Sequence, residues 1–209
     1  KRQLQYNMKK YVIELIGTFF IVFTVGLGSN PLSVGFAYIS MIYIGFNISG
    51  AHYNPVISLV MFLKKKISIK DLIFYIIFQI LGACLAATSI AMMKSNMQIQ
   101  PVLADSIYSV IFMEAIFTFF IIPAYFRATS NDLKKNSFYG LVIGLPLIVG
   151  IFSAAAVSGA VFNPAVSIGP SIIDILTGEG VSQYFTWYYL VGPLLGGILA
   201  YLLNKLFEK

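Results

Sequence analysis

Charged residues are scarce in this sequence: only 11% of its 209 residues are charged, whereas 58% are hydrophobic. Soluble domains carry about a quarter charged residues, so this chain has too few to cover a surface exposed to water. A lipid bilayer is the solvent that suits such a composition. Because a spanning helix takes about 20 apolar residues, the chain has room for about six spans with short connections. We therefore expect residues 1–209 to form a single membrane domain.

Residues that bind metals or perform catalysis are also scarce. The single cysteine, Cys84, excludes a disulfide within the chain. The single histidine, His52, has no cluster of cysteine or carboxylate residues beside it, and a metal site needs three or four ligands. We find no nucleophile–base pair and no cofactor-binding loop, so we expect neither an enzyme nor a bound cofactor. The net charge of +6 comes from basic clusters between apolar runs, as at membrane flanks, which argues against nucleic acid as a partner.

Six apolar runs predict six membrane-spanning helices, over residues 11–28, 33–48, 71–93, 108–126, 138–156 and 185–206. Two further segments, 49–63 and 157–176, are too short to span, or too interrupted by glycine and proline. Each is expected to be a re-entrant loop that leads into a half-helix. The sequence therefore predicts an all-α membrane protein with six transmembrane helices and two re-entrant half-helices.

The basic residues predict the orientation, because they gather in the cytoplasmic segments of membrane proteins. With the N-terminus in the cytoplasm, only Lys94 falls on the outside. The other thirteen lie inside: Lys1, Arg2, Lys9, Lys10, Lys64, Lys65, Lys66, Lys70, Arg127, Lys134, Lys135, Lys205 and Lys209. We therefore expect both termini in the cytoplasm, the two re-entrant loops on opposite sides of the bilayer, and the cell membrane as the location.

The two halves of the chain, about 11–93 and 108–206, carry matching blocks in the same order. ELIGTFF at 14–20 matches EAIFTFF at 114–120. Each half then has Ser-Gly-Ala followed by Asn-Pro: Ser49-Gly50-Ala51 before Asn54-Pro55, and Ser158-Gly159-Ala160 before Asn163-Pro164. Three spans in each half invert the second half relative to the first. Inverted repeats of this kind place the functional site near the midplane, at broken helices.

Asparagine followed by proline suits the start of a half-helix inside a membrane. Proline is tolerated at the first helical position, and asparagine before it caps free backbone donors. Two half-helices that enter from opposite faces bring their positive dipole ends together at mid-membrane. There the amides of Asn54 and Asn163 could donate hydrogen bonds to a passing solute, while the dipole ends repel cations.

These blocks resemble the aquaporin, or major intrinsic protein, family over nearly the whole chain. The resemblance rests on ELIGTFF, SGAHYNPV, YIIFQILGACLAA, EAIFTFF, SGAVFNPAVSIGP and VGPLLGG in their order. It implies a homotetramer in the lipid bilayer with one pore per subunit. The pore would carry a passive flow of water or small uncharged solutes such as glycerol, urea or hydrogen peroxide. It also implies that Glu14 and Glu114 are buried carboxylates that support the two loops.

The chain departs from the family pattern at two places in its motifs. The first motif reads Asn54-Pro55-Val56 where the family usually has alanine in third position, whereas the second keeps Asn163-Pro164-Ala165. The residue after the second motif is valine where the family nearly always has arginine. The resemblance places the outer constriction at Val34, Ile151, Ala160 and Val166. We expect a wider, apolar constriction that passes larger or less polar neutral solutes, or conducts water poorly.

Several alternatives remain open at this stage. His52 is either a loop residue hydrogen-bonded to backbone, or a pore-lining group that could gate with pH. A secondary active transporter can also use inverted repeats and broken helices. However, Glu14 and Glu114 are the only carboxylates in the interior of the predicted spans, and they already have a structural explanation. A third alternative is a poorly conducting tetramer with a structural or junctional role.

Overall fold

The computed structural model describes residues 2–28, 30–94, 97–100, 106–130 and 137–207. Within these residues the chain is helical and contains no strand. Six helices are long and apolar enough to cross a membrane. They are α1 (Arg2–Gly28), α2 (Pro31–Ser49), α4 (Ile69–Met93), α5 (Ile107–Ala128), α6 (Tyr139–Ser158) and α8 (Tyr188–Phe207).

The six predicted spans are confirmed, with ends that differ by a few residues. The largest differences lie at the starts of the first and the last helix. Helix α1 begins at Arg2, well before the predicted start at residue 11, because nothing in the basic flank breaks a helix. Helix α8 begins at Tyr188 rather than 185, because residues 185–187 form turns that follow a short 3-10 helix, η2 (Val181–Tyr184).

Two shorter helices begin at the Asn-Pro motifs. They are α3 (Pro55–Leu63) and α7 (Pro164–Thr177). In α3 the Asn54 side-chain oxygen accepts a hydrogen bond from the Val56 N–H at 2.8 Å. In α7 the Asn163 oxygen accepts one from the Ala165 N–H at 3.0 Å. Each asparagine therefore caps its own half-helix, with proline at the first position.

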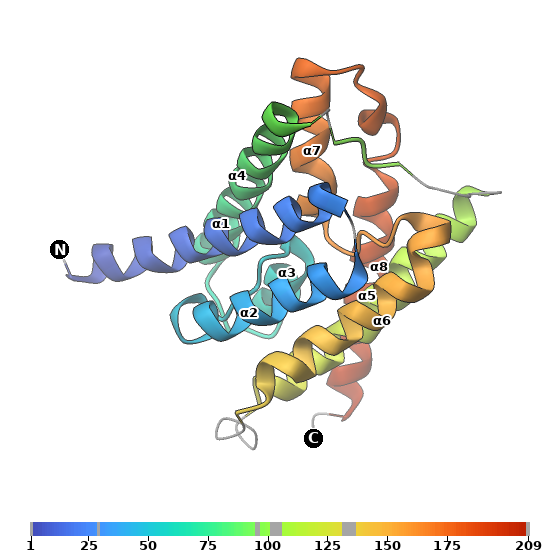
Figure 1. The fold of residues 1–209 in the computed structure, drawn as a ribbon. Coiled ribbons are helices and arrows are strands. Elements are labelled where there is room, and N and C mark those ends of the chain that lie inside the picture. Colours follow the sequence, from blue (N-terminus) through green and yellow to red (C-terminus); the bar gives the residue numbers. More distant parts are fainter. Residues whose placement is uncertain (1, 29, 95–96, 101–105, 131–136, 208–209) are drawn as a thin grey trace.

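The packing repeats itself between the halves (Figure 1). In the first half α1 packs against α2 and α4, and in the second half α5 packs against α6 and α8. Helices α2 and α6 join the halves. The half-helices cross over, since α7 packs on α4 of the first half and α3 contacts α8 of the second. The N-terminal ends of α3 and α7 therefore meet between the two halves.

Two glycines at matched positions let the spans of each half approach closely. A Cβ atom on Gly82 of α4 would lie 2.3 Å from the backbone oxygen of Leu15 in α1. A Cβ atom on Gly196 of α8 would lie 2.1 Å from the backbone oxygen of Ala115 in α5. Neither backbone could accommodate a side chain, and small residues at such contacts are typical of helices packed within membranes.

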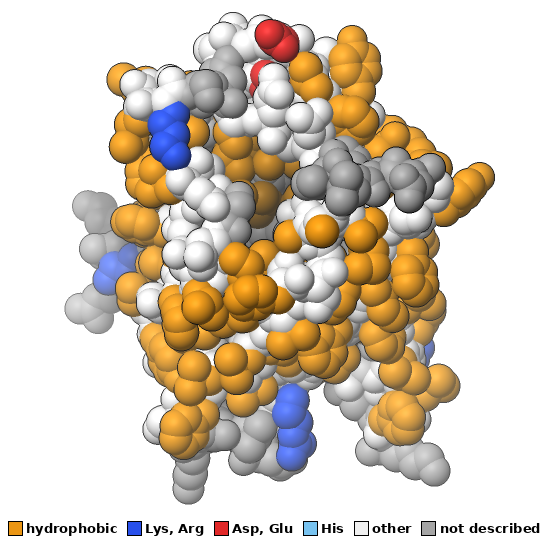
Figure 2. Space-filling view, turned by 45° about the vertical axis from the view of Figure 1, so that its right-hand side comes forward, with side chains coloured by type: hydrophobic (Ala, Val, Ile, Leu, Met, Phe, Trp, Pro, Cys, Tyr) orange, Lys and Arg blue, Asp and Glu red, His pale blue; other side chains and the backbone are white. Residues whose placement is uncertain are grey.

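Hydrophobic side chains cover much of the face of the bundle that Figure 2 shows. Large hydrophobic side chains are exposed along all six long helices, including Phe36, Leu85, Phe112 and Leu199. This surface and the six spans identify a multi-pass integral membrane protein. Four basic residues used above to predict orientation, Lys1, Lys134, Lys135 and Lys209, lie outside the described residues.

Candidate functional site: a cavity between two re-entrant loops

The loops that precede α3 and α7 adopt the same unusual backbone conformation. Positive φ angles occur at three matched positions: Gly50 (92°), Ala51 (54°) and Tyr53 (52°) in the first loop, and Gly159 (86°), Ala160 (55°) and Phe162 (52°) in the second. Residues other than glycine rarely adopt this conformation, and it persists only where the surroundings hold it. The loops are therefore strained segments that need support from the helices around them.

Glu14 of α1 provides support to the first loop. Its carboxylate is fully buried and accepts hydrogen bonds from the backbone N–H groups of His52 (2.9 Å) and Tyr53 (2.6 Å). It also accepts from the Ser49 hydroxyl (2.5 Å) and the Gln79 amide (2.8 Å). Four donors thus converge on one buried carboxylate, which is how a buried charge is kept stable.

Glu114 of α5 occupies the matching place beside the second loop. Its buried carboxylate accepts from the backbone N–H groups of Val161 (3.0 Å) and Phe162 (2.6 Å) and from the Ser158 hydroxyl (2.7 Å). No counterpart of the Gln79 amide is bonded to it among the described residues. The two halves therefore hold their loops in the same way, but with one donor fewer in the second half.

The two capping asparagines also bond across the interface between the halves. The Asn54 amide donates to the Phe162 carbonyl oxygen at 2.9 Å, and the Asn163 amide donates to the Tyr53 carbonyl oxygen at 2.8 Å. An asparagine amide has two N–H donors. Each asparagine therefore uses one N–H between the loops. Its second N–H can donate to a molecule in the space beside the loops.

That space is a cavity of about 440 Å³ bounded by the second loop, and both asparagines line it. Its wall also includes aliphatic residues of α1, α2, α5 and α6 and the segment 97–100. Among the described residues, no charged side chain lines the cavity. The polar groups that line it are two asparagines, two glutamines and a tyrosine: Asn54, Asn163, Gln98, Gln100 and Tyr38.

All four residues predicted to form the outer constriction line this cavity. They are Val34, Ile151, Ala160 and Val166, and each is buried. The structure thus places them around one space, although they come from α2, α6, the second loop and α7. The motif residues Pro55, Val56, Pro164 and Ala165 are buried at the starts of the half-helices and do not line the cavity.

His52 is not among the residues that line the cavity. Its side chain is almost fully buried, and its Nδ1 atom lies 3.0 Å from the Ser58 hydroxyl oxygen. The ring is edge-on to the rings of Tyr75 (centroids 5.0 Å apart) and Tyr125 (5.7 Å). Its hydrogen-bond partner is therefore a side chain, not the backbone group that the sequence suggested.

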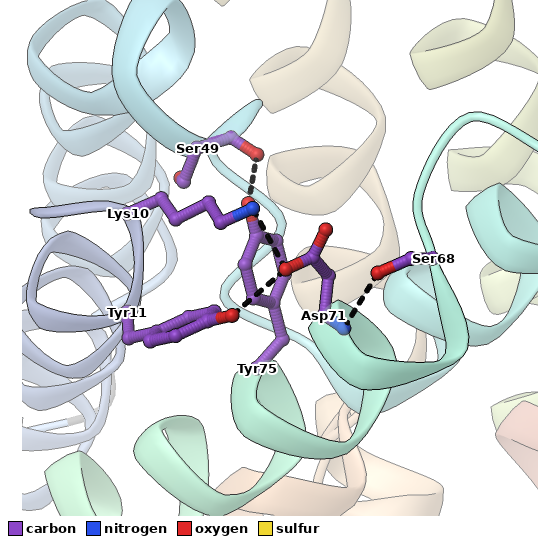
Figure 3. A network of polar contacts seen from close by, with 6 residues as sticks. All are labelled: Lys10, Tyr11, Ser49, Ser68, Asp71 and Tyr75. Carbon is purple, nitrogen blue, oxygen red and sulfur yellow. Dashed lines mark hydrogen bonds and ion pairs between the residues drawn. The ribbon is translucent and has the colours of Figure 1, made fainter. Parts of the chain in front are cut away.

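The structure reveals two polar networks that the sequence did not indicate. In the first, Lys10 and Tyr11 of α1 both contact Asp71 at the start of α4, at 2.7 Å and 2.8 Å (Figure 3). Close by, the Tyr75 hydroxyl donates to the Ser49 carbonyl oxygen at 2.7 Å, next to the first loop. This network ties α1 and α4 together beside the loop that Glu14 holds.

The second network holds one wall of the cavity. Asp174 of α7 accepts a hydrogen bond from the Ser182 N–H at 2.9 Å, and the Ser182 hydroxyl accepts one from the Ile99 N–H at 3.0 Å. Ile99 belongs to the segment 97–100 that lines the cavity. The position of that wall is thus set by a buried aspartate on the half-helix. No motif in the sequence pointed to this aspartate.

Comparisons with known proteins identify the family of this chain. The model of the family described as "Major intrinsic protein" matches residues 2–204. The chain belongs to the major intrinsic protein family. It is 33% identical to "Glycerol uptake facilitator protein-like 6" of Lactiplantibacillus plantarum, over 92% of this chain and 95% of that protein. It is 27% identical to "Aquaporin AqpM" of Methanothermobacter thermautotrophicus, over 92% and 94%.

A solved structure shows the same fold. The aquaglyceroporin from Plasmodium falciparum superposes with a TM-score of 0.82 over 94% of each chain, at 20% identity. Major intrinsic proteins are channels rather than enzymes. The functional class of this protein is therefore a membrane channel for water or small solutes.

Proposed function

We propose that the protein is a passive channel for water and small uncharged solutes, and that its pore runs past Asn54 and Asn163. The observation that carries this proposal is the cavity that these two asparagines line. Each amide keeps one N–H donor beside the cavity after bonding to the opposite loop. A solute oxygen could therefore replace its hydrogen bonds to water with one hydrogen bond from each asparagine.

The starts of the two half-helices favour neutral solutes. Backbone dipoles make each helix N-terminus positive, and here two N-termini face the same space. No carboxylate among the described cavity residues offsets this positive potential. A cation entering the cavity would lose water and gain no counter-charge, whereas a neutral solute avoids both penalties.

The outer constriction is apolar, which sets the kind of neutral solute that passes. Its four side chains, Val34, Ile151, Ala160 and Val166, offer no hydrogen bond to a solute. Transfer of a hydroxyl group into such surroundings without a partner costs about 1–3 kcal/mol. Solutes with fewer hydroxyl groups and more apolar surface should therefore cross this ring more easily than polyols of the same size.

A panel of solutes tests the proposal directly. The purified protein is reconstituted in liposomes, and water, glycerol, urea, 1,2-propanediol and hydrogen peroxide permeabilities are measured by stopped flow or dye oxidation. We expect permeability above that of empty liposomes, with 1,2-propanediol faster than glycerol. Rates equal to empty liposomes for every solute would refute the channel. Uptake that collapses with a proton or sodium gradient would indicate a transporter instead.

The Val166→Arg variant tests the position of the constriction. An arginine would add bulk and donors to the ring, so we expect glycerol permeability to fall relative to water permeability. At about 5 Å and an effective dielectric constant of about 20, its charge would also repel a cation by about 3 kcal/mol. Val166→Met is the matched control, because it adds length without charge. An unchanged ratio of glycerol to water in both variants would place the constriction elsewhere.

The assembly and orientation of the channel are proposals as well. The family resemblance supports a homotetramer, and the exposed apolar side chains of the long helices offer surfaces for contact with lipid or other subunits. The distribution of basic residues supports cytoplasmic termini, and the cell membrane is the location we expect.

A further inference from the structure

The inverted repeat pairs two residues of very different size beside the two loops. A shift of 100 residues brings Glu14 onto Glu114 and Thr18 onto Thr118, and it brings Val25 onto Tyr125. A shift of 109 residues brings Gly50 of the first loop onto Gly159 of the second. If the halves were identical, Tyr125 would bear the same relation to Gly50 that Val25 bears to Gly159.

On the side of the second loop, which we call the outer half of the pore, the space is open. Val25 and Gly159 both line the 440 Å³ cavity. Among the described residues, none donates a hydrogen bond to the Gly159 carbonyl oxygen. The loop is reachable by water, with 9% of Ala160 and 8% of Val161 exposed.

On the side of the first loop, the inner half of the pore, the equivalent space is filled. The Tyr125 hydroxyl donates a hydrogen bond to the carbonyl oxygen of Gly50. The Tyr125 ring is fully buried, edge-on to His52. Ala51 is 0% exposed and His52 is 1% exposed, so water does not reach the part of this loop that corresponds to the open outer wall.

We propose that Tyr125 forms a second constriction, in the inner half of the pore, which limits permeation and solute size. Its hydroxyl occupies the carbonyl acceptor that a permeating solute would otherwise use, and its ring occupies the space that Val25 leaves free in the outer half. A solute passes only when the side chain swings away and the Gly50 carbonyl is released. This inference rests on the proposed channel function and adds a control point to the outer ring.

The test compares three variants with the wild-type protein in liposomes, with water and glycerol as probes. Tyr125→Val places the repeat-related residue at this position, and Tyr125→Phe removes only the hydroxyl. Tyr108→Val is the control, because Tyr108 lies on the same helix α5 and is 80% exposed. Circular dichroism and gel filtration establish that each variant is folded.

We expect Tyr125→Val to raise both permeabilities by about tenfold, the factor that a barrier lower by about one hydrogen bond would produce. Tyr125→Phe should raise water permeability by a smaller factor, and Tyr108→Val should leave both unchanged. If Tyr125→Val does not fold, Tyr125→Phe carries the test, because its ring keeps the packing.

The outcomes separate this inference from the proposed function. Wild-type conduction that neither Tyr125 variant increases would overturn the inner constriction and leave the channel standing. If the wild type conducts and Tyr125→Val conducts faster than the wild type, both the channel and the constriction are supported. Rates equal to empty liposomes for the wild type and both Tyr125 variants would refute both.

Discussion

Replacing Glu114 by glutamine exchanges one carboxylate oxygen for an NH₂ group at a place where only acceptors fit. The carboxylate faces three donors: the Ser158 hydroxyl and the N–H groups of Val161 and Phe162. A glutamine can keep the oxygen toward the first two donors. Its NH₂ group then faces the Phe162 N–H, which now lies 2.6 Å from a carboxylate oxygen.

The expected cost follows from these contacts. One buried N–H is left without an acceptor, which costs about 1–3 kcal/mol, and the remaining bonds lose the assistance of the charge. We therefore expect Glu114→Gln to lower the free energy of unfolding by about 2–4 kcal/mol. For a chain of this size, that corresponds to a melting temperature lower by roughly 5–15 °C.

The single cysteine provides the assay. Cys84 is half-buried on α4, and its sulfur lies 3.9 Å from the Gly169 carbonyl oxygen of α7. A thiol-reactive fluorophore in detergent therefore reports the separation of α4 from the half-helix on heating. A melting temperature of Glu114→Gln within about 2 °C of the wild type would refute the role of the carboxylate in holding the loop.

Glu14→Gln is the internal comparison, because Glu14 accepts four hydrogen bonds where Glu114 accepts three. The Gln79 amide beside it has a side-chain oxygen with no partner among the described residues. If that amide turns over, its oxygen can accept from the new NH₂ group. We expect Glu14→Gln to cost no more than Glu114→Gln despite the additional bond, and a clearly larger loss would mean that Gln79 cannot adapt.

Two further predictions concern the packing of the bundle and the wall of the cavity. Gly196→Ala should prevent stable folding, because its Cβ would lie 2.1 Å from the Ala115 carbonyl oxygen; near-normal yield and melting temperature would contradict the close helix contact. Asp174→Asn should weaken the hold on segment 97–100 through Ser182. We expect faster amide hydrogen exchange at Ile99 with a melting temperature lower by about 2–4 °C, and unchanged exchange would contradict this connection.

Much of the fold was predictable because its signals are local. Apolar runs of the length of a bilayer predicted the six spans, and the paired Asn-Pro motifs predicted where α3 and α7 begin. The ends of the spans were less predictable. Residues 185–187 before α8 include the aromatic Phe185 and Trp187, and hydrophobicity alone cannot distinguish such a turn from the first turn of a helix.

The site was predictable only in part. The repeat indicated Glu14, Glu114 and the two asparagines. Which donors and acceptors each of them bonds to could be read only from the structure. Gln79 stands beside Glu14 because α4 packs on α1, and nothing in its own neighbourhood along the chain marks it. Asp174 was missed for the same reason, since its connection to Ile99 joins α7 to a distant segment.

The sequence by itself determined that this is a six-span membrane protein with an inverted repeat and two capped half-helices, because composition, periodicity and paired motifs are properties of the chain. Only the tertiary structure showed that Tyr125 packs against the first loop, whereas a cavity lies beside the second loop. Tyr125 lies on α5 and Gly50 lies in the first loop, 75 residues away along the chain. Whether a side chain fills a pore or leaves it open depends on where packing places it, and the linear order of residues does not contain that information.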